Sequence, residues 1–263
     1  MLKKKSIGIA LAGALALVAS GAAFAAPVNV GGVVFNPDQT FNPIFQATNF
    51  RETSVTTAGQ TLLGYGMITN LNNEYPTQFC PGCDLTFTFS YTVKDVNGQQ
   101  VVFDGGALNF YVVQNFNVND PSSAMGTTPW LTLTGHTYPF IGYSTDGTLY
   151  STVTGPVGAP TTASGFGLLD VSGGMAGKFF DTNSQTDGSD FLLNSSFQLA
   201  TGNDICTGAG GTGTCYPIAG QGGLTGLATT PVPEPGEMGL LGLGLAILGF
   251  FIQRRRKEAD GRA

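Results

Sequence analysis

The chain has little positive charge outside its two ends. Between residues 26 and 235 the only cations are Arg51, Lys94 and Lys178, which stand against fourteen carboxylates, so this segment has a net charge of about −11. A surface of that sign is repelled by nucleic acid and by anionic lipid. The composition therefore excludes nucleic acid as a partner. The negative charge either keeps the protein soluble or draws divalent cations to its surface.

Catalytic patterns are also missing from the sequence. The one histidine, His136, is placed in a solvated Gly-His-Thr turn, and a single imidazole cannot build a metal site of two or three histidines, although it could serve a triad. Residues 142–147 miss the nucleophile elbow because the second Gly comes one residue late and no helix follows. No pair of acids stands out as a glycosidase pair. The sequence therefore predicts no enzyme and no catalytic residue.

The N-terminus has the pattern of a secretory signal peptide. Residues 3–5 are lysines, residues 7–18 form an apolar region, and Ala23 and Ala25 supply the small residues of a cleavage site. The alternative, an N-terminal membrane anchor, needs about 20 apolar residues, more than this region contains. Residues 1–25 are therefore predicted to be removed during export.

Three features follow one another near the C-terminus. A Pro-Glu-Pro motif keeps the chain extended, and the uncharged residues 238–252 are predicted to form a single transmembrane helix. A basic cluster then resists translocation and holds the C-terminus in the cytoplasm. The motif is Pro233, Glu234 and Pro235, and the basic stop is Arg254, Arg255, Arg256 and Lys257.

This tail resembles the PEP-CTERM sorting signal of Gram-negative bacteria over residues 232–257. The resemblance implies an exosortase as partner, processing near the motif, and a host that makes exopolysaccharide. Glu237 departs from the usual pattern, but the helix dipole favours an acid in a first turn. The protein is therefore expected to cross the inner membrane, to be anchored there transiently, and then to reach the cell surface or the extracellular space.

Between the two signals the sequence predicts strands and almost no helix. Residues 84–93 alternate apolar and polar side chains, the period of a half-buried strand. Asn97-Gly98 and Asp146-Gly147 are hairpin turns. Such short segments indicate an all-β fold, an antiparallel β-sandwich that is jelly-roll-like or barrel-like. The predicted strands are residues 28–35, 61–68, 84–93, 101–103, 107–116, 130–134, 138–143, 148–154 and 191–199.

Composition sets the predicted domain boundaries. Glycine dominates residues 201–230, and a segment with few large apolar side chains does not bury enough surface to offset its ordering entropy. Residues 206–231 are therefore predicted to form a flexible stalk. The predicted order is signal peptide 1–25, β-sandwich ectodomain 26–205, the stalk, and sorting signal 232–257.

The four cysteines are predicted to form two local disulfides, because an exported protein is oxidised. Cys80 and Cys83 flank Pro-Gly, the favoured centre of a type II turn, and Cys206 and Cys215 flank a Gly-rich loop. A four-cysteine zinc site is the alternative, although the eight residues inside the second pair exceed the usual spacing. Haem attachment would need His where Asp84 stands, and a redox pair would need a βαβ unit.

One acidic loop has the composition of a calcium site. Calcium prefers six to eight oxygen ligands on a tight turn, and the loop also contains one Gly, although it does not match the EF-hand pattern. The alternative is a polar turn in which Asp and Asn cap their own backbone. The candidate ligands are Asp181, Asn183, Asp187 and Asp190.

Two functions of different classes fit these observations. The first is a structural, non-enzymatic protein of the cell surface or extracellular matrix, associated with exopolysaccharide or biofilm. The second is an adhesin-like module that binds polysaccharide through exposed aromatic side chains such as Trp130 and several tyrosines, with calcium as a candidate cofactor. Aromatic rings exposed in a row would favour binding, whereas buried rings would favour the structural protein.

Overall fold

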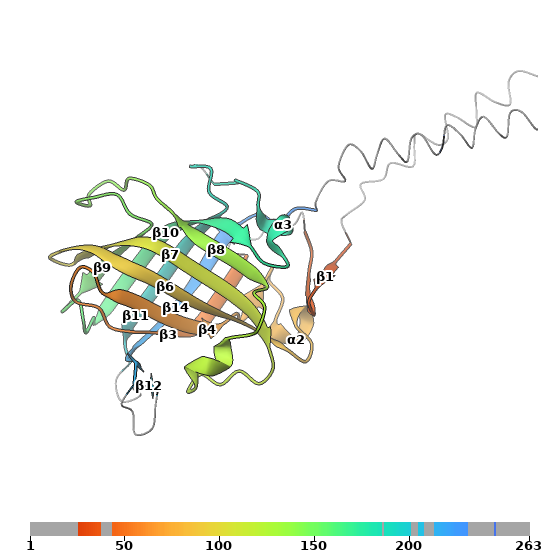
Figure 1. Ribbon diagram of the computed structural model, residues 1–263, viewed down its shortest axis with the longest axis horizontal. Helices are drawn as coiled ribbons and strands as arrows, with labels where there is room; N and C mark the ends of the chain where they lie inside the picture. Colours follow the sequence, from red (N-terminus) through yellow and green to blue (C-terminus); the bar gives the residue numbers. More distant parts are fainter. Residues whose placement is uncertain are drawn as a thin grey trace, which may run out of the picture. The chain divides into compact units, whose positions relative to one another are not determined.

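The structure is a computed structural model, and the chain divides into two units, residues 1–229 and residues 230–263. Most of the first unit is described, and its strands form an antiparallel sheet that closes into an eight-stranded barrel (Figure 1). The described residues are 26–37, 44–185, 187–200, 205–207, 213–230 and 245.

The barrel wall contains nine strands in eight positions, because two short strands share one position. The neighbouring strands are all antiparallel and hydrogen-bonded. They are β3 (Phe45–Glu52), β4 (Thr61–Met67), β6 (Asp84–Asn97), β7 (Gln100–Val113), β8 (Leu131–His136), β9 (Leu149–Thr154), β10 (Thr162–Gly173), β11 (Phe191–Leu199) and β14 (Ile218–Gly226).

Smaller elements cover the ends of the barrel or extend its loops. The predicted strand 28–35 is divided into a hairpin by a turn at Gly31 and Gly32, both of which have positive φ. The smaller elements are β1 (Val28–Val30), β2 (Val33–Phe35), β5 (Asn70–Leu71), α2 (Pro76–Phe79), η1 (Pro121–Ala124), α3 (Gly177–Phe180), β12 (Ile205–Cys206) and β13 (Cys215–Tyr216).

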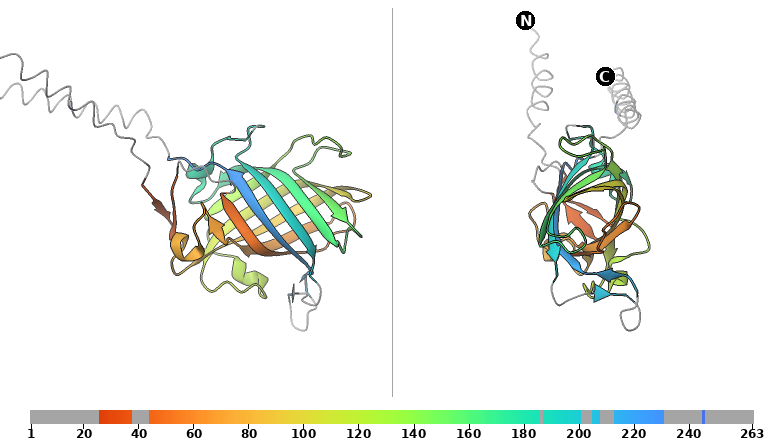
Figure 2. Two further views of the ribbon diagram at one scale, coloured as in Figure 1. Left: turned by 180° about the vertical axis from the view of Figure 1, so that it is seen from behind. Right: turned by 90° about the vertical axis from the view of Figure 1, so that its left-hand side faces the viewer.

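The all-β prediction is confirmed, but the predicted sandwich is corrected to a closed barrel. β10 pairs with β11 on one side and with β8 and β9 on the other, and this double pairing closes the ring. The strands wrap around one interior (Figure 2). A closed sheet has no unpaired edge, whereas each layer of a sandwich has two.

The predicted hairpin around Asp146-Gly147 is wrong. His136 at the end of β8 pairs with Leu168, and Leu149 at the start of β9 pairs with the adjacent Gly167, so the two strands lie end to end. Residues 137–148 leave the wall as an excursion that contains only an isolated bridge between Tyr138 and Gly147. The excursion's aromatic side chains pack on the outer face of the barrel, which favours this path over a hairpin.

The predicted stalk is also wrong, because part of it is a barrel strand. β14 lies between β11 and β3 and pairs with both. Its glycines are needed for close packing: a Cβ on Gly220 would lie 2.4 Å from a ring atom of Phe50. Glycine therefore marks contact with an aromatic ring here, not a flexible chain. The folded domain continues at least to Ala228, which is 1% exposed, instead of ending at residue 205.

One end of the barrel is filled by an aromatic plug. The indole of Trp130 is fully buried, and its Nε1 donates a hydrogen bond to the carbonyl of Val30 at 2.8 Å. Ring centroids in the plug are 5.2 to 6.3 Å apart, at distances typical of favourable aromatic pairs. The plug consists of Phe35, Phe45, Phe110, Trp130, Phe180 and Phe191.

Candidate functional site

The predicted processing sites lie outside the described residues. This applies to the signal-cleavage residues Ala23 and Ala25, to the whole sorting motif and to the basic stop. The predicted transmembrane helix at residues 238–252 also lies outside them, apart from Leu245. Among the residues that the structure describes, no helix is both long enough and apolar enough to cross a membrane.

Both predicted cysteine pairs are at bonding distance. The sulfur atoms of Cys80 and Cys83 are 1.95 Å apart, and those of Cys206 and Cys215 are 2.03 Å apart. The first bridge follows the short helix α2. The second joins β12 to β13, where the two cysteines are direct strand partners.

The candidate calcium loop is organised around one buried carboxylate. Asp190 is 2% exposed, and its oxygens accept hydrogen bonds from the backbone N–H groups of Val171, Thr182 and Asn183. This is the geometry of the polar-turn alternative. The described residues contain no group of three His, Cys, Asp or Glu side chains that could hold a metal. Calcium binding by Asp181, Asn183, Asp187 and Asp190 stays a prediction.

The surroundings of His136 contain no catalytic triad among the described residues. His136 is not in a solvated turn as predicted: it ends β8, and its Nδ1 lies 2.9 Å from Oδ2 of Asp170 on the neighbouring β10. In the described part of the chain its Nε2 has no hydroxyl within hydrogen-bond distance. Ser144 donates its hydroxyl to Asp95 instead of to His136.

Most of the aromatic residues that were candidates for carbohydrate binding are buried. Trp130 belongs to the plug, and Tyr65 and Tyr91 are 2% and 3% exposed. One group packs on the outer face of the barrel wall, with ring centroids 4.8 to 6.2 Å apart, and two of its rings, Tyr138 and Tyr150, are also buried. We call it the outer aromatic cluster, and it consists of Tyr138, Phe140, Tyr143, Tyr150 and Phe166.

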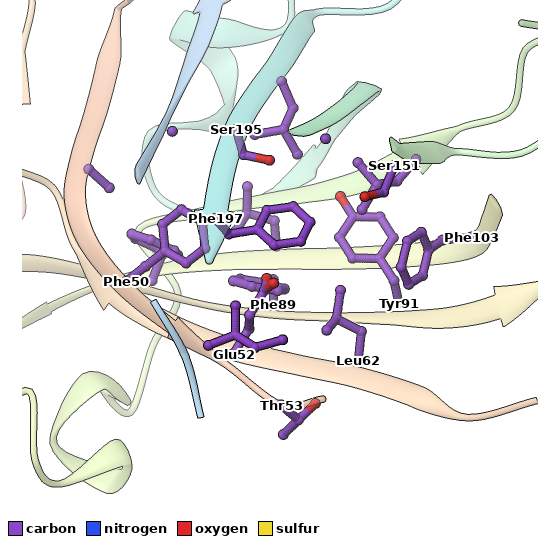
Figure 3. Close-up of a pocket in the computed structure, with 18 of the residues that line it drawn as sticks. Phe50, Glu52, Thr53, Leu62, Phe89, Tyr91, Phe103, Ser151, Ser195 and Phe197 are labelled. Carbon is purple, nitrogen blue, oxygen red and sulfur yellow. The ribbon is translucent and has the colours of Figure 1, made fainter. Parts of the chain in front are cut away.

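The barrel encloses a cavity that was not predicted from the sequence. The cavity has a volume of about 100 Å³ and is lined mainly by apolar side chains (Figure 3). Val55 and Val157 line it from the loops that follow β3 and β9. These two loops are joined by a hydrogen bond of 2.5 Å from Oγ of Ser54 to the carbonyl of Gly158. Eight-stranded barrels are just wide enough to be filled by side chains or to hold one small ligand.

Three buried polar side chains that have no hydrogen-bond partner among the described residues lie between the rings that line this cavity. Glu52 comes from β3, Tyr91 from β6 and Ser151 from β9, and Figure 3 shows them among phenylalanine rings. Burial away from water raises the pKa of the Glu52 carboxyl to about 8 and raises the pKa of Tyr91 well above its usual range. Successive side chains of a strand point to opposite faces, so the neighbouring cation Arg51 projects outward, toward Tyr65.

The sequence around Glu52 contains a signal for this site. Residues 45–52 are absent from the predicted strands, and their alternation is broken at Thr48 and Asn49, which are both exposed at a bulge. Beyond the bulge, Phe50 and Glu52 alternate with Arg51. That alternation places Glu52 on the same face of the strand as the large aromatic side chain of Phe50. An acid that shares a face with such a side chain indicates a buried carboxyl group.

The fold and the bonded cysteines define an all-β protein with a disulfide-bonded, closed antiparallel barrel. Residues 231–257 match the family described as the PEP-CTERM protein-sorting motif. The chain is therefore a PEP-CTERM sorting domain-containing protein, and the motif implies export, recognition by an exosortase and targeting to the cell surface. No curated protein and no solved structure matches the chain.

Proposed function

We propose that the protein is a non-enzymatic structural component of the cell surface or extracellular matrix, associated with exopolysaccharide and processed by an exosortase. The observation that carries this proposal is the sorting motif at residues 231–257, which directly follows a closed barrel. The closed wall and the two disulfides suit a protein that must stay folded in an oxidising environment outside the cell. Among the described residues His136 contacts Asp170 but makes no hydrogen bond to a hydroxyl group, which supports a non-enzymatic role.

Replacing Pro233, Glu234 and Pro235 by alanine is expected to abolish processing. The wild-type protein should lose residues 1–25 and the segment after about residue 235, whereas the variant should keep its tail and remain in the inner-membrane fraction. Mass spectrometry of the surface and membrane fractions checks this result. The control Thr230→Ala, just before the motif, should be processed normally. Peptides containing residues 254–257 in secreted wild-type protein would contradict the prediction.

Polysaccharide binding is the second candidate, and the outer aromatic cluster favours it. Phe140 is 39% exposed at the edge of this cluster, and its neighbour Ile141 is fully exposed. Phe140→Ala is expected to weaken co-sedimentation with the host's exopolysaccharide about tenfold, the effect of losing about 1.4 kcal/mol of ring contact. Tyr75→Ala is the matched control, because Tyr75 is 67% exposed but lies outside the cluster. Equal binding by both variants would exclude this surface, and loss of binding in EDTA would assign a role to calcium.

A further inference from the structure

The cavity contains polar groups whose hydrogen-bonding capacity is unused. The exposed fractions of Glu52, Tyr91 and Ser151 are 4%, 3% and 3%. Among the described residues, none of their side-chain oxygens has a hydrogen-bond partner. Burying a polar group without a partner costs stability, and folded proteins pair nearly all such groups. Three unpaired groups around one cavity therefore point to a partner that is not part of the protein chain.

The lining restricts the chemistry of this partner. Thr53, whose hydroxyl accepts a hydrogen bond from Leu63 N–H, and Ser195 also line the cavity. The rest of the surface is mainly aromatic and aliphatic, with Phe50, Phe89 and Phe103 among the rings. No Lys, Arg or His lines the cavity, so an anion would meet a carboxyl group and no compensating charge. The cavity has room for about seven to ten non-hydrogen atoms, since a water-sized group occupies roughly 10–15 Å³ by this measure.

We propose that the barrel cavity binds a small, neutral, largely apolar molecule that carries one hydrogen-bond acceptor, such as a carbonyl oxygen, and that Glu52 donates to this acceptor. This inference goes beyond the proposed function, because a surface or matrix role does not require a ligand inside the barrel. Processing of the chain tests the proposed function, whereas ligand binding tests the cavity proposal, so the failure of one can be told from the failure of the other.

The protonation states of Glu52 and Tyr91 explain why the expected ligand carries a hydrogen-bond acceptor. With its pKa raised to about 8, Glu52 keeps its proton at neutral pH and is a hydrogen-bond donor. Tyr91 is the other titratable group that lines the cavity, and its raised pKa keeps it neutral as well. The cation next to Glu52 in the sequence, Arg51, is on the outer face of β3 and does not neutralise the carboxyl from inside. A neutral acceptor therefore finds donors without having to bring a counter-charge into an apolar space.

Three probes of matched chain length distinguish the ligand classes. They are 2-octanone, octylamine and octanoate, which are neutral, cationic and anionic at about pH 6.5. Titration of the purified full chain by calorimetry should show saturable binding of 2-octanone that exceeds the binding of the other two at least tenfold. Affinity for 2-octanone should fall about tenfold between pH 6.5 and pH 9.5, because Glu52 loses the proton that it donates.

Four variants test whether binding occurs at this site. Glu52→Leu should weaken 2-octanone about tenfold, whereas Glu52→Gln keeps an N–H donor and should restore binding without the pH dependence. Leu193→Phe should abolish binding, because Leu193 lines the cavity. Leu192→Phe makes the same change one residue earlier, on the outer face of β11, and should bind normally. A cooperative thermal transition in each variant shows that the barrel has folded.

Several outcomes would overturn the proposal. Tighter binding of octylamine or octanoate than of 2-octanone would refute the ligand class. Equal binding by the folded Leu193→Phe and Leu192→Phe variants would place the probe outside the cavity. No saturable binding by the wild-type protein would mean that the cavity holds water only.

Discussion

A chain that ends at Ala200 is expected to lose the barrel fold completely, whereas a chain that ends at Thr230 should keep it. The shorter chain lacks β14, which pairs with β11 on one side and with β3 on the other. Its loss opens two strand edges and uncovers the buried ring of Phe191, against which Gly226 packs. Exposed edges and apolar surface favour aggregation over a closed fold.

The near-ultraviolet circular dichroism of the single Trp130 and the cooperativity of urea unfolding measure this effect. The chain ending at Thr230 is the matched control, because it lacks only the sorting tail and retains every barrel strand. A cooperative, monomeric chain ending at Ala200 would show that residues 206–231 are a stalk after all. It would also show that the barrel folds without β14.

Glu52→Gln is expected to remove a large pH dependence of stability. In the folded protein Glu52 holds its proton up to about pH 8, whereas in the unfolded chain it ionises near the ordinary value of 4.5. Between these pH values the unfolded state binds fewer protons, so the free energy of unfolding falls as pH rises. The loss is complete above about pH 8 and amounts to on the order of 5 kcal/mol. Glu52→Gln has no ionisable group at this position, so its free energy of unfolding should lack this pH dependence.

Urea unfolding of both proteins at intervals from pH 4.5 to pH 9 checks this prediction. The two curves should diverge with increasing pH, and Glu52→Gln should be the more stable protein at pH 9. Glu74→Gln removes the same formal charge from an acid that does not line the cavity, and it should not show this divergence. Parallel curves for wild type and Glu52→Gln would mean that the carboxyl is solvated.

Strands with regular alternation could be predicted from the sequence, but closure of the barrel could not. Residues 84–93 form part of β6 because their period of two is unbroken. The predicted hairpin between β6 and β7 is also present, but its two turn residues are Gly98 and Gln99, one position later than predicted, because Asn97 still pairs with Gln100. The strands that were missed, β3, β10 and β14, contain a bulge or several glycines. Their stability comes from partners distant in the sequence, which local propensity does not report.

The cysteine pairs could be predicted because each pair is local, whereas the cavity depends on long-range packing. Glu52, Tyr91 and Ser151 are far apart in the sequence and share a site only because the barrel brings three strands together. The 137–148 excursion shows the same limit. Asp146-Gly147 has hairpin composition, but the packing of Tyr138 against Tyr150 on the outer wall decides the path of the chain.

The pairing of β14 with β3 also determines when the barrel can form during secretion. Phe45, near the start of the domain, pairs with Leu224, near its end, so the ring cannot close until almost the whole domain has left the secretion channel. Such a long-range contact makes folding slow, because the entropy of a very large loop is lost before the contact is gained. The closing strand ends at Gly226, only a few residues before the Pro-Glu-Pro motif. A cut at or after this motif would therefore remove none of the nine wall strands, since all of them lie before residue 227.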